Sequence, residues 1–235
     1  MSYLIKANQN EFRPRNIAKL LFINLLGYET EFGQMECLTL ISRPTFVEKR
    51  IGYLGITNLF SEKSEILMMA THRIRTDFDA TDPYLQGVAI QTFSQIATDD
   101  MCRDLGGPLA DLIGKGHSYI SKKACLAGIR VIKRAPEHIG VFCQRLEKVM
   151  ETKNHGLLLS ALALAKEIIT KDPSKKTYFE KFVPHLVLFY NLDNQVQVID
   201  NCSSRRIHYL RSERSVPTNR NARVLQTVVE GCRTD

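Results

Sequence analysis

The amino-acid sequence predicts an all-α solenoid, in which pairs of helices repeat along the chain. The first observation is a period of 35 to 37 residues, at which small residues recur: Gly52, Gly87, Ala124 and Ala161. The second is a residue typical of a helix end twelve positions further on in each unit: Ser64, Asp99, Pro136 and Pro173. A unit of this length holds two helices and two turns, and it buries its apolar face only against its neighbours. Folds of this kind present surfaces to partners and seldom catalyse reactions.

The helices follow in order from the spacing of apolar residues. A short helix is expected over 17–26, with Gly27 as its C-terminal stop. Because Ala18 lies 34 residues before Gly52, this helix is the second member of a pair, and only the polar stretch 8–11 and a short tail precede it. Four complete pairs are expected at 33–42 with 46–60, 64–78 with 82–97, 101–113 with 118–134, and 137–151 with 155–171.

A last helix is expected to begin near Ser174 and to run through Phe182, Leu186 and Phe189. Beyond it the composition changes, since all seven basic residues from Asn191 onward are Arg. Three segments are therefore expected: an irregular one over 1–16, the helical repeats over 17–190, and an irregular or disordered Arg-rich tail over 191–235. The repeats would then open and close in mid-repeat.

Composition narrows the class of protein further. Apolar residues make up 44% and charged residues 24% of the 235 residues, which suits a soluble protein with a sizeable core. No apolar run approaches the roughly 18–20 residues of a membrane span, and the first residues lack the pattern of a signal peptide. The six cysteines are scattered without a CxxC pair, so reduced cytosolic thiols are expected rather than disulfides or zinc ligands.

Motifs that carry catalysis are not evident. The glycines of 106–108 and 114–116 belong to turns between helices and do not form a phosphate loop. The six histidines never lie three or four residues apart, as paired metal ligands on a helix would. Asp99 and Asp100 precede Met101 and are interpreted as a helix cap. We therefore expect no enzyme, no metal and no cofactor.

Basic residues are the best candidates for a binding site, because the net charge of +7 favours anionic partners. Arg13, Arg15 and Lys19 cluster at the start of the first helix, and the last two share one helical face. Three cations and the free amides of a helix start form a candidate anion site. The alternative is an ordinary solvated helix start.

A second, weaker candidate is a basic ridge across the repeats. Lys49-Arg50 and Lys122-Lys123 occupy nearly equivalent places in two repeats, and equivalent positions of a solenoid line up on one side. The other repeats carry Leu85-Gln86 and Leu159-Ser160 there, so the ridge would be interrupted. A ridge of this kind is also the basis of an alternative function, a helical-repeat module that binds nucleic acid or another polyanion.

Several strings resemble the large-chain trunk of the clathrin adaptor complexes, over about residues 11 to 190. The matching strings are Arg15–Leu21, Leu26–Tyr28, Phe32–Leu38, Lys49–Gly55, Gln86–Gly87, Met101–Leu105 and Lys153–Gly156. Among them KRIGYLG at 49–55 and MCRDL at 101–105 resemble gamma-type rather than alpha- or delta-type chains. The fold that this resemblance implies is a solenoid of HEAT/armadillo-like helical hairpins, the adaptin N-terminal trunk.

The resemblance implies a coat-assembly role without catalysis. Gamma-type chains join a beta-type large chain, a medium chain and a small sigma-type chain in a hetero-oligomer on Golgi, endosome and clathrin-coated vesicle membranes. An Arf-type GTPase and phosphatidylinositol 4-phosphate recruit the complex from the cytoplasm, and it selects dileucine and tyrosine-based cargo signals. A basic cluster in related chains contacts the phosphoinositide headgroup, and Arg13, Arg15 and Lys19 occupy the matching places. No nucleic acid is then expected as a partner.

The chain also departs from the family's pattern. The first helix of the family, whose basic residue helps to hold the acidic end of a dileucine signal, has no match here. The further helices, the hinge and the ear, which follow in the family after about residue 190, have no match here either. Contacts with clathrin and accessory proteins are therefore not predicted.

Overall fold

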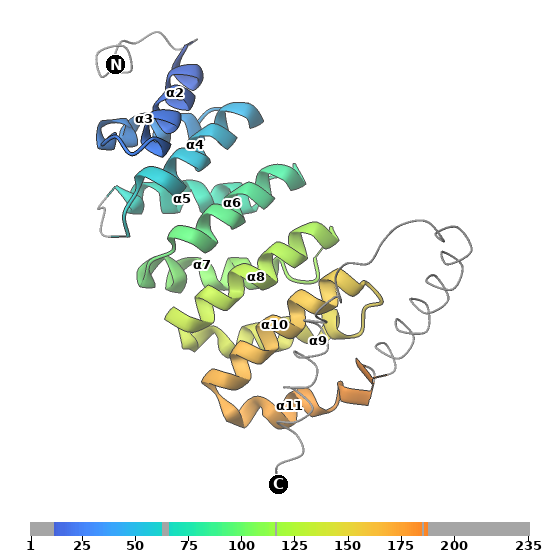
Figure 1. The fold of residues 1–235 in the computed structure, drawn as a ribbon. Helices are drawn as coiled ribbons and strands as arrows, with labels where there is room; N and C mark the ends of the chain where they lie inside the picture. Colours follow the sequence, from blue (N-terminus) through green and yellow to red (C-terminus); the bar gives the residue numbers. More distant parts are fainter. Residues whose placement is uncertain (1–11, 63–65, 116, 185, 188–235) are drawn as a thin grey trace, which may run out of the picture.

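The structure, a computed structural model, describes residues 12–62, 66–115, 117–184 and 186–187, and within these ranges every regular element is a helix. The chain folds as a stack of helical pairs (Figure 1), which confirms the predicted fold class. The elements are α2 (Arg13–Leu25), η1 (Glu31–Gly33), α3 (Gln34–Ile41), α4 (Phe46–Leu59), α5 (Leu67–Phe78), α6 (Pro83–Ile96), α7 (Asp99–Asp111), α8 (Ser118–Arg134), η2 (Pro136–His138), α9 (Ile139–Met150), α10 (His155–Lys171), η3 (Pro173–Lys175) and α11 (Lys176–Glu180).

The helices form two layers that run the length of the stack. Helices α4, α6, α8 and α10 pack side by side in one layer, and α3, α5, α7 and α9 lie behind them in the other (Figure 1). Helix α2 packs against α4 and α3 at one end. A single apolar cluster passes through all repeats, from Ile17 in α2 to Leu186. The stack therefore has one continuous core between its layers.

Helix boundaries agree with the sequence prediction at most ends. Helix α2 differs, because it begins at Arg13 rather than at Ile17. The last helix differs more, because α11 ends at Glu180 and a turn at 181–182 interrupts the continuous helix that was expected through Phe182. Pro14 lies in the first turn of α2, where the ring's fixed φ suits a helix and no amide hydrogen bond is lost. Gly27, at φ +92°, ends this region in the left-handed conformation expected of a C-terminal glycine. The expectations for residues 1–11 and 188–235, including Phe189 and the tail, lie outside the described residues.

One predicted cap is also different. The side chain of Thr98, not an aspartate, caps α7 by accepting a hydrogen bond from the Met101 amide, 3.4 Å away. Asp99 and Asp100 instead form the first turn of α7, where their charges favour the positive end of the helix dipole.

The small residues at the repeat positions all lie in the layer of α4, α6, α8 and α10 and are buried. Their contacts differ, however. A Cβ on Gly52 would lie 2.9 Å from the backbone nitrogen of Ile41, so this glycine allows α3 and α4 to pack closely. A Cβ on Gly87 would instead meet the Tyr119 ring of α8, in the following repeat. The period thus identifies the correct helices but not one common contact.

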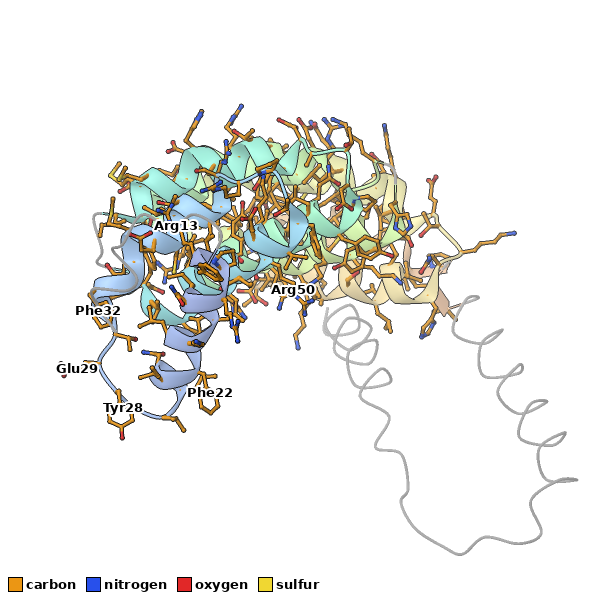
Figure 2. All side chains as sticks on the ribbon, turned by 90° about the horizontal axis from the view of Figure 1, so that it is seen from above. Arg13, Phe22, Tyr28, Glu29, Phe32 and Arg50 are labelled. Atoms are coloured by element: carbon orange, nitrogen blue, oxygen red, sulfur yellow. The ribbon has the colours of Figure 1, made fainter. Side chains whose placement is uncertain are left out.

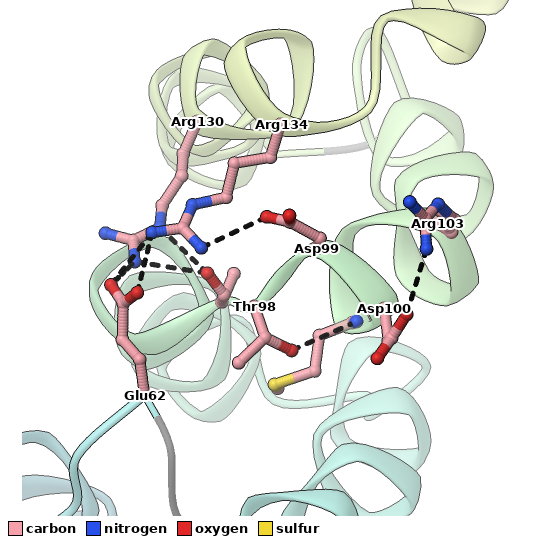
Figure 3. A network of polar contacts seen from close by, with 9 residues as sticks. Glu62, Thr98, Asp99, Asp100, Arg103, Arg130 and Arg134 are labelled. Carbon is pink, nitrogen blue, oxygen red and sulfur yellow. Dashed lines mark hydrogen bonds and ion pairs between the residues drawn. The ribbon is translucent and has the colours of Figure 1, made fainter.

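A polar network joins repeats that are not adjacent (Figure 3). The carboxylate of Glu62, in the connection after α4, accepts hydrogen bonds from Arg130 at 2.6 Å and from Arg134 at 2.8 Å, both on α8. Arg134 also reaches Asp99 at 3.2 Å, and Arg130 donates to the Ala97 carbonyl at the end of α6. The pKa of Glu62 is lowered, mainly by the hydrogen bond from Arg134. The network spans the whole repeat formed by α5 and α6.

Candidate anion site

Helix α2 turns two different faces to its surroundings. Ile17, Leu20 and Leu21 are buried against α3 and α4. Arg15 and Lys19 lie on the opposite side, are exposed, and have no ion pair or side-chain hydrogen bond within the described residues. Because the two cations are four residues apart, they lie one turn apart on the same face. The structure therefore brings these two predicted site residues together.

Arg13, the third predicted residue, has a different environment. Its Nε lies 3.2 Å from Oε2 of Glu36 on α3, and the two side chains are only 11% and 19% exposed. The pair is an ion pair in distance, although neither of these two atoms has the geometry of a hydrogen bond. Figure 2 shows Arg13 within the body of the molecule. Arg13 thus helps to fix α2 on α3 and is less accessible than Arg15 and Lys19.

The helix start itself favours an anion. Among the described residues no side chain caps it, and no acidic residue lies in its first turn. Uncapped amides at a helix N-terminus carry partial positive charge, which adds to that of nearby cations. Next to the two free cations, a shallow depression of about 480 Å³ is lined by Arg15, Ala18, Lys19, Phe22 and Ile23. Chemically, this surface can hold a phosphate beside an apolar group.

Lys49 does not belong to a surface ridge, and this part of the prediction is wrong. Its ammonium group is buried and lies 2.5 Å from Oδ1 of Asp77 on α5. The hydroxyl of Tyr53 donates to Oδ2 of the same carboxylate, also at 2.5 Å. Burial and the hydrogen bond to Asp77 raise the pKa of Tyr53 well above its ordinary value, so the phenol stays protonated. The three side chains form a closed polar group between α4 and α5.

The other three residues of the expected ridge lie in different environments. Arg50 is exposed on α4 (Figure 2). Lys122 is half-buried, and Lys123 donates to the Gln91 side chain while its Nζ lies 5.5 Å from the centre of the Tyr119 ring. Burial also lowers the pKa of Lys123. The arrangement gives no continuous line of free cations.

Sequence reasoning missed Asp77 as the partner of Lys49. A signal was present, since Ala70, Ile74, Asp77 and Phe78 follow the spacing of one buried helical face. A carboxylate at such a position needs a buried partner, because an unpaired buried charge is very costly.

A second hollow, between α5 and α7, was also not anticipated. It has a volume of about 610 Å³ and an apolar floor that includes Leu67, Met101 and Leu105. Arg75 stands on its α5 side and Asp104 on its α7 side. Throughout the described ranges, this hollow included, no three His, Cys, Asp or Glu side chains are placed to hold a metal ion. No helix there is long and apolar enough to cross a bilayer.

Comparison with solved structures supports the fold. The AP-3 complex, in a homology model of an intermediate open conformation, contains a chain that matches 94% of this one with a TM-score of 0.65 at 20% sequence identity. This chain covers 38% of that chain. A designed armadillo repeat protein matches with a TM-score of 0.65 at 14% identity, and the match covers 98% of this chain and 97% of that protein. These likenesses concern the fold alone.

Comparison with curated proteins shows closer relatives. The chain is 41% identical over 175 residues to AP-1 complex subunit gamma-1 of Mycosarcoma maydis, covering 74% of this chain and 20% of that protein. It is 40% identical over 183 residues to AP-1 complex subunit gamma of Dictyostelium discoideum, covering 78% of this chain and 20% of that protein. It spans about a fifth of the length of these relatives. Residues 4–222 match the family described as the adaptin N-terminal region, and the chain belongs to that family.

Proposed function

We propose that the chain acts as a non-catalytic scaffold segment of a clathrin-associated adaptor complex, in vesicle-mediated intracellular protein transport. The observation that carries the proposal is the identity of about 40% to AP-1 gamma subunits of two distant organisms, over three quarters of this chain. The two-layer stack of helices agrees with such a role, because solenoids present extended surfaces to other chains. Coat assembly and cargo sorting at the trans-Golgi network and endosomes are the processes proposed.

The partners proposed are a small sigma-type chain, a beta-type large chain and an Arf-type GTPase, in a hetero-oligomer that binds the cytoplasmic face of Golgi membranes. Large apolar side chains exposed along the stack support docking of other chains. Val47, Leu54, Met68 and Leu126 are each more than half exposed, on α4, α5 and α8.

Co-expression tests this assembly. The full chain with an affinity tag is produced together with a sigma-type and a beta-type chain, and the purified material is examined for stoichiometric capture. A variant that carries Leu54→Ser and Leu126→Ser changes this exposed surface without touching the core, and it should capture less of the partner chains. Capture of both partners by the wild-type chain supports the proposal. A monodisperse chain that captures neither partner contradicts it.

The membrane ligand proposed is phosphatidylinositol 4-phosphate, bound at the start of α2. Arg15 and Lys19 are the main contacts, because both are exposed and neither pairs with a side chain in the described part of the chain. Arg13 contributes mainly by holding α2 against α3 through Glu36. Charge-assisted hydrogen bonds to phosphate are strong but screened by salt at an exposed site, so binding should weaken steeply as ionic strength rises.

Vesicle co-sedimentation tests the headgroup site. Arg15→Ala with Lys19→Ala should reduce binding to vesicles containing phosphatidylinositol 4-phosphate by about tenfold or more, since each charge-assisted hydrogen bond contributes about 1.5–3 kcal/mol. Lys166→Ala is a matched control, as Lys166 is exposed on the distant helix α10. Unchanged binding of the double variant contradicts the assignment. Equal binding to any polyanion, including nucleic acid, would instead support the polyanion-binding alternative.

A further inference from the structure

We propose that the exposed face of α2 enters the headgroup region of an anionic bilayer, with Phe22, Leu25 and Leu26 inserted beside the lipid phosphates that Arg15 and Lys19 hold. The inference deepens the proposed headgroup site and rests on it for the anchoring charge. It adds an apolar contact with the lipid itself, which a soluble phosphate could not make.

The first observation is the composition of this face. Arg15, Lys19, Phe22 and Leu26 are separated by four, three and four residues, so they form one stripe along α2. Phe22 is 63%, Leu25 73% and Leu26 60% exposed. A helix face turned to water normally carries polar side chains, whereas the second half of this stripe is apolar. Exposed Phe and Leu beside cations allow apolar side chains to enter the interface while positive charge meets the anionic headgroups.

The second observation is the continuity of charge and apolar surface. The depression beside Arg15 and Lys19 is formed by Ala18, Phe22 and Ile23, so the surface becomes apolar directly next to the two cations. A phospholipid likewise changes from charged to apolar, from the phosphate through the glycerol to the acyl chains. Long basic side chains can place their charge at phosphate level while their methylene groups lie deeper. Cations near an anionic surface are attracted to it, and this attraction falls off within a Debye length.

The orientation follows from the loop after α2. Tyr28 and Glu29 are exposed there, and an inserted carboxylate would oppose binding to anionic lipid. Figure 2 shows Phe22 on one side of the projecting end of α2, and Tyr28 and Glu29 on the other. A bilayer that contacts the stripe of Phe22 and Leu26 therefore leaves Glu29 in water. Helix α2 lies flat on the surface in this arrangement, with Tyr28 outside the lipid.

A fluorescence experiment tests insertion directly, because the chain contains no Trp. Phe22→Trp places a single indole on the inserted face, and Tyr28→Trp places one at an equally exposed site on the other side. With vesicles of phosphatidylcholine and phosphatidylinositol 4-phosphate, emission of the first variant should shift to shorter wavelength and be quenched by lipids brominated near the top of the acyl chain. The second variant should show neither effect. Equal quenching of both, or of neither, overturns the proposal.

Serine variants distinguish insertion from headgroup binding. Leu25→Ser with Leu26→Ser, neither of which lines the depression, should weaken vesicle binding about tenfold while leaving the affinity for soluble inositol phosphate unchanged. Headgroup binding that persists without quenching at position 22 overturns insertion and leaves the headgroup site intact. Quenching that survives Arg15→Ala with Lys19→Ala overturns the headgroup site but supports insertion. If the serine variant instead converts an oligomer to a monomer in size-exclusion chromatography, the face is a protein interface and the proposal fails.

Discussion

Removal of one member of the buried group formed by Lys49, Tyr53 and Asp77 should destabilise the chain strongly. The side chains of Lys49 and Asp77 are 8% and 4% exposed and their charged atoms are 2.5 Å apart. Asp77→Asn leaves the ammonium group buried without a countercharge, and Lys49→Met leaves the carboxylate with only the hydroxyl of Tyr53. Loss of one partner of a buried ion pair costs about 3–5 kcal/mol.

The size of the effect can be converted to a melting temperature. A change of 1 kcal/mol shifts the midpoint of a domain of about 150–250 residues by about 2–4 °C, so either single variant should melt about 6–20 °C lower. The double variant Lys49→Met with Asp77→Leu replaces the pair by apolar groups of similar volume. It should recover part of the loss, because such replacements are often neutral or stabilising, whereas the buried hydroxyl of Tyr53 is left without its acceptor.

Thermal and urea unfolding followed by circular dichroism at 222 nm measure these values in the full chain. Arg50→Met is the matched control, since Arg50 is the exposed neighbour of Lys49 on α4. The reasoning is refuted if both single variants cost less than about 1 kcal/mol. It is also refuted if the cost of the double variant equals the sum of the costs of Lys49→Met and Asp77→Leu, each measured alone, because a coupled pair must be non-additive.

Three further outcomes are expected. Gly52→Ala should lower the free energy of unfolding in urea by about 1–3 kcal/mol, because its Cβ would lie 2.9 Å from the backbone of α3. Gly140→Ala, with open space around it, should instead stabilise α9 by about 0.5–1 kcal/mol. The opposite order of the two effects would contradict the packing. The pKa of Glu62 is lowered by Arg134, so its contribution to stability is complete above pH 4.5 and is lost as pH falls through the lower folded value. The urea midpoint of Glu62→Gln should therefore fall less between pH 6 and pH 3 than that of the wild type, and parallel curves would exclude the contribution. Burial raises the pKa of the Cys125 thiol to about 12, so mass spectrometry should find it unmodified by iodoacetamide at pH 8 until urea unfolds the chain, and rapid labelling of the folded chain would contradict this.

Local patterns were sufficient to predict most of the helices, although residues 106–108, expected in a turn between helices, lie inside α7. Gly27 ends α2 and the apolar spacing in α8 and α10 marks both helices with their observed bounds, because these signals act within a few residues. The start of α2 was placed four residues too late. Pro14 was available as a signal there, since proline in a first turn marks a helix start.

Side-chain partners were much harder to predict, because they lie far apart in the sequence. Lys49 looks like a surface residue beside Arg50, and only packing shows that Asp77, 28 residues later, meets it. Arg13 resembles Arg15 in sequence, yet its contact with Glu36 separates their roles. A period of repeats places helices on the same layer, but it does not define which neighbour a given side chain faces.

The network centred on Glu62 has a mechanical consequence. In a stack whose repeats each contact only their neighbours, the junction between any two repeats can bend separately. Glu62 joins the connection after α4 to Arg130 and Arg134 on α8, and so bridges the repeat of α5 and α6 from one side. This bridge resists relative movement of the repeats on either side of α5 and α6. Because the side chain of Glu62 is half exposed, dissolved ions screen its charge and weaken the bridge. The stiffness of the helical stack should therefore decrease as ionic strength rises.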